Sequence, residues 1–215
     1  MPKLFLKARD PLSCYTHFIG FVLAIIGTLA ILVKIALNGF YSSAAMGLLF
    51  CISLMGLYGA SSLYHSSNTP TETIKRLRKL DHSMIYVLIA GTYTPLLFNI
   101  LPEPKNMVLV AVIWGLALAG IVMKLCWIEA PRWLGTTLYI LMGWFIAIDF
   151  SALSVLETEA IILLIAGGFF YTTGGIMYAI KKPNISKMFG FHEVFHIFIM
   201  AGSLCHYFMV LCYLV

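Results

Sequence analysis

The chain has 215 residues, of which 61% are hydrophobic and only 11% are charged, and its mean hydropathy is +0.94. Soluble domains carry about 25% charged residues, so a soluble fold of this length cannot cover so much apolar surface. The formal net charge of +5 lies in short connections, where anionic lipid headgroups and membrane orientation explain it. The composition predicts an integral membrane protein and does not support nucleic acid as a partner.

Seven continuous apolar runs follow one another, each about 20 residues long, as a bilayer core requires. Continuous runs differ from the alternating ten-residue segments of a β-barrel. The basic start of the chain resembles a signal peptide, but the run after Thr16 is too long, and we interpret it as the first span. The sequence predicts an all-α, polytopic fold forming a single domain over residues 1–215. The predicted spans lie near 15–37, 43–65, 81–100, 107–127, 133–154, 159–180 and 191–214.

Basic residues gather in the connections on one side of these spans. They are Lys3, Lys7, Arg9, Lys75, Arg76, Arg78, Lys79, Lys124, Arg132, Lys181, Lys182 and Lys187. The other side has only Lys34 and Lys105, and it carries acidic residues instead: Asp149, Glu157 and Glu159. The positive-inside rule therefore predicts a cytoplasmic N-terminus and a C-terminus outside.

Two histidines begin the last span. His192 and His196 are four residues apart, so on a helix their side chains share one face, one turn from each other. Ionisable residues within a span usually mark a functional site, and two histidines at this spacing are half of a metal-binding constellation. The alternative is that both imidazoles sit at the water interface without a metal.

The cytoplasmic ends of the second and third spans supply further polar residues. Ser61 and His65 are four residues apart at the end of the second span, and Asp81 opens the third. The predicted topology places these three residues within about two turns of the same membrane face as the two histidines of the last span. We therefore expect one cluster near the cytoplasmic face.

Three neutral imidazoles without a fourth protein ligand are the pattern of an open, catalytic Zn²⁺ site. The open position is expected to hold water, whose pKa zinc lowers towards ~7. Asp81 is a candidate general base, or a residue that orients a ligand histidine. Ser61 is a candidate donor to the developing oxyanion or to the substrate carbonyl.

Each of these residues taken singly has a structural interpretation. His65 fits an interfacial imidazole, Asp81 fits the N-cap of the third span, and Ser61 fits a helix-packing serine. Convergence of all of them at one depth and on one side favours the site.

Other polar residues are given no catalytic role. Glu193 fits a first-turn acid favoured by the helix dipole. His17 and His82 lie on the same side as the cluster. Two roles are open for them: contact with lipid headgroups, or contact with the ligand histidines without binding the metal. His206 is about 15 Å deeper than His196 by helix rise, too far to share an ion.

Three short motifs occur in order: Ser61-x3-His65, Asp81-His82 with Ala90-Gly-Thr-Tyr-Thr-Pro95 behind it, and His192-x3-His196. They resemble the signature of the hemolysin III family, the bacterial branch of the progestin and adiponectin receptor (PAQR) family, over essentially the whole chain. The resemblance implies a seven-helix membrane fold with a zinc ion near the cytoplasmic side. It implies that the zinc ligands are His65, His192 and His196, that Asp81 contacts the water at the zinc, and that Ser61 lies near the metal.

Two functions remain open. The first is an intramembrane zinc hydrolase that cuts an amide or ester bond in a membrane lipid, because the resemblance implies relatives linked to ceramide hydrolysis. The alternative is a non-enzymatic sensor, a regulator of membrane state or a cytolytic factor in which zinc is structural. No row of charges crosses the predicted spans, so a conducting pathway is not expected. We expect a multi-pass protein of the cell membrane in either case.

Overall fold

The computed structural model describes residues 2, 5–39, 42–186 and 189–215. Two of the basic residues predicted on the cytoplasmic side, Lys3 and Lys187, lie outside the described residues. Seven of its helical segments are long and apolar enough to cross a membrane, which confirms the all-α, seven-span prediction. The main helices are α1 (Pro11–Asn38), α2 (Ser42–Ser66), α3 (Thr71–Ile100), α4 (Lys105–Cys126), α5 (Arg132–Gly143), α6 (Thr158–Ile180) and α7 (Phe191–Met209). Three short segments accompany them: η1 (Phe5–Lys7), η2 (Phe145–Val155) and η3 (Val210–Leu214).

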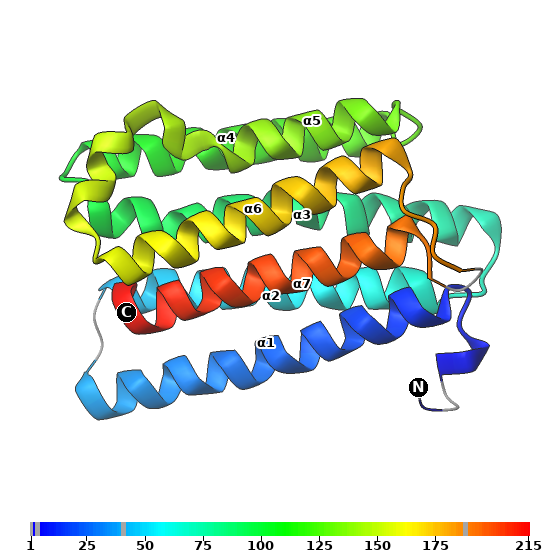
Figure 1. Cartoon of the computed structure of the whole chain (residues 1–215), viewed down its shortest axis with the longest axis horizontal. Coiled ribbons are helices and arrows are strands. Elements are labelled where there is room, and N and C mark those ends of the chain that lie inside the picture. The colour runs from blue at the N-terminus through cyan, green and yellow to red at the C-terminus, as the bar shows by residue number, and fades with distance from the viewer. Residues whose placement is uncertain (1, 3–4, 40–41, 187–188) are drawn as a thin grey trace.

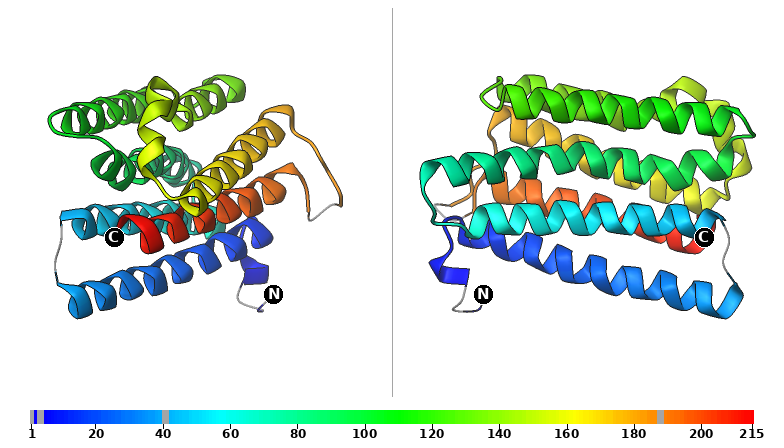
Figure 2. Two further views of the ribbon diagram at one scale, coloured as in Figure 1. Left: turned by 60° about the vertical axis from the view of Figure 1, so that its left-hand side comes forward. Right: turned by 180° about the vertical axis from the view of Figure 1, so that it is seen from behind.

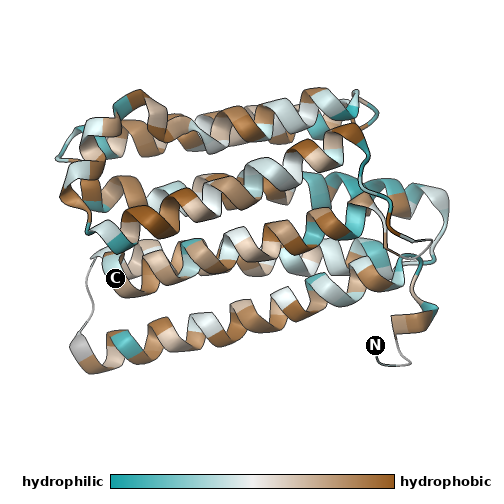
Figure 3. Ribbon diagram, viewed as in Figure 1, coloured by the Kyte–Doolittle hydropathy of each residue, from teal (hydrophilic) through white to brown (hydrophobic). Residues whose placement is uncertain are grey.

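The helices run up and down in one bundle, with the two ends of the chain at opposite ends of the bundle (Figure 1). Helix α3 packs between α2 and α4, whereas α7 packs against α1 and α6 (Figure 2). In α3, 67% of the apolar window is buried, against 22% in α1, α4 and α6, so α3 is the central helix. Hydrophobic residues cover the helices along most of their length, and polar residues gather near the end where the N-terminus lies (Figure 3).

Helix α3 is longer than the apolar pattern predicts, because it begins at Thr71 and not near residue 81. Its first turns are rich in Lys, Arg and Glu, which are good helix formers, so the helix continues beyond the apolar core. Asp81 consequently lies inside the helix, and the interpretation of Asp81 as the N-cap of this span is wrong.

The fifth span is interrupted. Helix α5 ends at Gly143, and the chain continues as the 3₁₀ segment η2, in which Asp149 has non-helical dihedral angles. The hydroxyl of Tyr93 on α3 donates to the Gly143 carbonyl at 2.6 Å and accepts the Ile146 N–H at 3.2 Å. Because Tyr93 binds backbone groups on both sides of the break, the break is compatible with an apolar surrounding.

Helix α1 is tied to two other helices at its N-terminal end. The backbone N–H of Asp10 donates to the His65 carbonyl at the end of α2, at 3.0 Å. The hydroxyl of Ser13 donates to the carboxylate of Glu193 in the first turn of α7, at 2.7 Å. The start of α1, the end of α2 and the start of α7 are therefore held together at one end of the bundle.

Candidate metal centre

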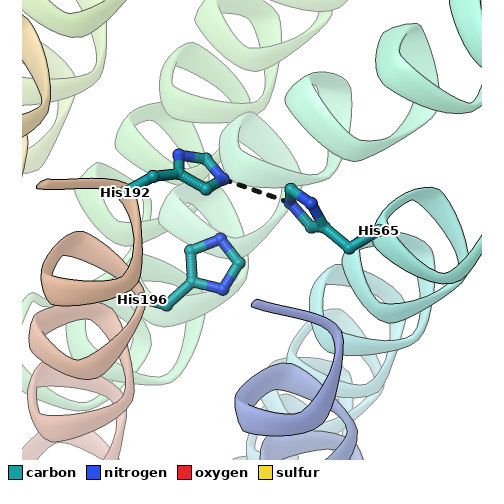
Figure 4. Close-up of side chains that lie close together, drawn as sticks. All are labelled: His65, His192 and His196. Carbon is teal, nitrogen blue, oxygen red and sulfur yellow. Dashed lines mark hydrogen bonds between the residues drawn. The ribbon is translucent and has the colours of Figure 1, made fainter. Parts of the chain in front are cut away.

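Three histidines meet at this end of the bundle. His65 lies in the last turn of α2, and His192 and His196 lie one turn apart on α7. One ligand nitrogen of each ring lies within 4.8 Å of the others. The Nε2 atoms of His65 and His192 are 3.2 Å apart, and the three rings turn towards a common point (Figure 4). The structure thus brings together the three residues that the sequence predicts as metal ligands.

The cluster is buried on the bundle side and partly open on the other. His65 is 3% exposed and His196 is 1% exposed, whereas His192 is half-buried. Imidazoles held among packed helices have few alternative rotamers, so the packing itself organises the cluster. The partial exposure of His192 leaves a route by which an ion or a solute reaches the cluster.

One pair of nitrogens in the cluster has the spacing of a tetrahedral metal site. With metal–nitrogen bonds of about 2.0–2.1 Å, two ligand nitrogens in a tetrahedron lie about 3.3 Å apart. The Nε2 atoms of His65 and His192 lie 3.2 Å apart. Two imidazole lone pairs at this separation repel each other unless a proton or a cation lies between them. The His65–His192 pair therefore fits a metal ion such as Zn²⁺, with His196 close enough to be a third ligand, although imidazole also binds other transition metals.

Asp10 is a member of the site that the sequence analysis missed. Its Oδ2 lies 2.9 Å from Nδ1 of His65, so the Nδ1 proton points to the carboxylate and the Nε2 lone pair points to the cluster. The hydrogen bond from His65 is the largest cause that lowers the pKa of Asp10 to about 2, and Arg9 acts in the same direction. A carboxylate on the second nitrogen of a ligand histidine is a recurrent feature of metal sites. The only available signal was an acid directly before the first span, on the same predicted side as the histidines.

Asp81 and Ser61 lie beside the cluster. Both are buried, with exposures of 8% and 1%, and the Ser61 hydroxyl lies next to the Asp81 carboxylate. Nδ1 of His82 is 3.3 Å from Oδ2 of Asp81. Asp81 is not one of the three residues whose ligand atoms converge. The structure places it as a neighbour of the ligands, and its catalytic role stays a prediction.

The remaining polar residues separate into neighbours of the cluster and residues remote from it. The His17 ring stacks on the His196 ring at 3.6 Å between centroids, and neither nitrogen of His17 has a hydrogen-bond partner among the described residues. Glu193 accepts the Gly190 N–H at 2.9 Å and so caps α7, as its first-turn position predicts. His206 lies apart from the cluster, with Nε2 3.3 Å from the Leu164 carbonyl on α6.

Comparisons with known proteins agree with this arrangement. The sequence model of the family described as Haemolysin-III related matches residues 5–207. Hemolysin-3 from Bacillus cereus is 35% identical over 202 residues, which cover 94% of this chain and 90% of that protein. The Hemolysin-3 homolog of Bacillus subtilis (strain 168) is 35% identical over 213 residues, which cover 99% and 97%. A seven-span membrane fold, a three-histidine cluster and matches over nearly the full length lead to one conclusion: the chain belongs to the hemolysin III family.

Proposed function

We propose that the protein is a zinc-dependent intramembrane hydrolase that cleaves an amide or ester bond of a membrane lipid. The observation that supports it most is the convergence of three imidazoles whose ligand atoms lie within 4.8 Å. The proposal places this end of the bundle at the cytoplasmic face of the cell membrane, because the basic connections lie there.

Zinc is the proposed ion because three neutral imidazoles without a thiolate are typical of open, catalytic zinc sites. When bound, zinc supplies a Lewis acid that polarises a carbonyl and lowers the pKa of water to ~7. His65, His192 and His196 hold the ion in this proposal, and Asp10 keeps the His65 ring in the ligating tautomer through the 2.9 Å contact.

The neighbouring side chains supply proton transfer and orientation. Asp81 takes a proton from the attacking water while the water oxygen forms a bond to the carbonyl carbon. Ser61 donates a hydrogen bond to the carbonyl oxygen as negative charge develops there. The bond from carbon to the nitrogen or oxygen of the leaving group then breaks, and Asp81 returns the proton to that atom. The products are a fatty acid and an amine or an alcohol.

The position of the cluster supports a lipid as the substrate. The ligands occupy the end of α2 and the start of α7, close to where both helices leave the apolar core. A scissile bond just below the headgroups of a bilayer lies at that level, whereas a fully water-soluble substrate does not.

A second candidate is a non-enzymatic membrane protein in which the metal is structural. The name Hemolysin-3 carried by the relatives favours a cytolytic factor of this kind. A structural metal predicts that chelation lowers the melting temperature strongly and that no lipid is turned over.

Turnover of a panel of amide and ester lipids separates the two candidates. The hydrolase proposal expects turnover by zinc-loaded protein, loss of turnover after chelation and its return when zinc is added back. Asp81→Asn is expected to keep the metal and to lose turnover, because only proton transfer is removed. Full turnover by metal-free protein contradicts the proposal, and so does an Asp81→Asn variant as active as the unmodified chain.

A further inference from the structure

Lys124, in the last turn of α4, is a largely buried lysine whose amine has no hydrogen-bond or ion-pair partner among the described residues. The residue is 4% exposed, and the one interaction of its charge within the described residues is the face of the Tyr139 ring, 5.9 Å away. Other lysines near helix ends do have acceptors: Lys34 donates to the Leu211 carbonyl at 2.7 Å, and Lys79 donates to the Leu125 carbonyl. Burying an unpaired charge is costly, so an anion beside this amine would stabilise Lys124, and the described residues do not place a carboxylate there.

The Lys124 amine points at the first turn of α5. Nζ lies 2.6 Å from the point where a Cβ on Gly135 would stand, so only glycine leaves room for the amine there. Nζ is also 5.9 Å from the centre of the Tyr139 ring, one turn further along the same helix face. The chain thus seats a cation against the N-terminal turns of α5.

Among the described residues, no acidic side chain caps this helix N-terminus. Pro131 provides no side-chain cap, and the first turn contains no acidic residue. The N–H groups at the start of a helix lack intrahelical partners and carry partial positive charge. The one acid of the connection from α4 to α5, Glu129, is engaged with Arg78 at 3.2 Å.

A second cation stands on the same turn. Arg132 is the first residue of α5, and its guanidinium lies 4.5 Å from the Tyr178 ring centre and 5.2 Å from that of Phe191. Its Nη1 is buried and has no hydrogen-bond partner among the described residues. Arg132 and Gly135 are three residues apart, so they share the face of α5 at which the Lys124 amine ends.

We propose that Lys124, Arg132 and the first turn of α5 bind the phosphate of an anionic phospholipid headgroup. Trp127, shortly before this turn, and Trp133, within it, are 53% and 63% exposed. Exposed tryptophans at helix ends mark the headgroup level of a membrane, so a lipid phosphate lies at the depth of the site. The site is independent of the proposed hydrolysis, since it neither contains the histidines nor needs a metal.

The full chain in nanodiscs tests this site. We expect a higher melting temperature in phosphatidylglycerol than in phosphatidylcholine, whose phosphate stands beside its own cationic group. Lys124→Gln is expected to abolish that difference. It is also expected to weaken the retention of phosphatidylglycerol in native mass spectrometry by about tenfold, which is the effect of losing one hydrogen bond to a charged group. Lys181→Gln is the matched control, because it removes an exposed lysine at the same end of the bundle, and it is expected to keep the difference.

Gly135→Ala provides a variant without a charge change. Its methyl group displaces the Lys124 amine, so we expect the same loss of the lipid effect. The proposal is overturned if Lys124→Gln keeps the phosphatidylglycerol effect, or if it raises the melting temperature equally in both lipids, as removal of a merely unpaired charge would. Inorganic phosphate added to phosphatidylcholine nanodiscs is expected to have no effect. If it reproduces the shift, the ligand is free phosphate and the lipid assignment is wrong.

Discussion

Nδ1 of His65 and Oδ2 of Asp10 lie 2.9 Å apart, although the two residues are 55 positions apart in the chain. The contact joins the last turn of α2 to the residue before α1, and it directs the free nitrogen of His65 towards His192. One ring of the three-histidine cluster is thus oriented by a residue outside the spans.

Asp10→Ala is expected to weaken zinc binding by about 10–100-fold, because the His65 ring loses the carboxylate that fixes its orientation and tautomer. Competition with a chromogenic chelator measures this affinity. Arg9→Gln is the control: Arg9 also contacts Asp10, at 2.9 Å, but it leaves the contact to His65 in place, and its affinity should stay close to that of the unmodified chain. Equal affinities for Asp10→Ala and the unmodified chain contradict the orienting role.

Two adjacent glycines of α6 provide a test of the packing of α6 on α7. A Cβ at Gly167 would stand 2.3 Å from the imidazole of His206, whereas a Cβ at Gly168 meets nothing within 4 Å. Gly167→Ala should therefore destabilise the protein by about 1–3 kcal/mol through overpacking. Gly168→Ala should leave stability unchanged or raise it by up to about 1 kcal/mol through helix propensity. Reversible unfolding in detergent measures both, and equal effects at the two positions would show that this helix interface is wrong.

Ser203 links three helices inside the bundle. It accepts the hydroxyl of Tyr58 on α2 at 2.6 Å and lies 2.9 Å from the hydroxyl of Tyr171 on α6. Ser203→Ala leaves the buried Tyr58 phenol and the half-buried Tyr171 phenol short of a partner, and we expect a loss of about 1 kcal/mol, the scale of hydrogen bonds between membrane helices. Zinc affinity should not change. The exposed Ser154, which donates only to the Ser151 carbonyl, is the control for an alanine substitution.

His17 packs on His196, a proposed metal ligand, and is not itself one of the three histidines whose ligand atoms converge. The ring lies 3.6 Å from that of His196 and nearly parallel to it. His17→Phe keeps an aromatic ring in the stack and removes two buried nitrogens without partners, so it should bind zinc as the unmodified chain does and melt no lower. His17→Ala should lower the melting temperature, since it leaves a cavity beside His196. A His17→Phe variant that has lost its zinc would make His17 a ligand.

The number of spans and the two candidate ligands of the last helix could be predicted from local pattern, whereas their role as metal ligands stays a prediction. A run of about 20 apolar residues identifies a span, and the separation of four between His192 and His196 is a property of one helix. The first turns of α3 could not be delimited in this way. The segment that begins at Thr71 is helical but charged, so hydropathy does not reveal it.

The missed parts of the site depend on contacts between distant residues. Asp10 precedes the apolar run and becomes part of the site only when α1 packs against the end of α2. The break after Gly143 likewise depends on Tyr93, which lies on another helix and binds the backbone on both sides of it. The spacing of residues within one segment does not reveal contacts with other segments, such as those made by Asp10 and Tyr93.

The metal content of the purified protein tests the central claim most directly. Elemental analysis of the full chain, purified without added metal or chelator, should find close to one zinc per chain, and His65→Ala should reduce that content to background. Ser154→Ala, remote from the cluster, should retain the zinc. A purified, folded chain without zinc, or a His65→Ala variant that holds as much zinc as the unmodified chain, would contradict a zinc centre built on the three histidines.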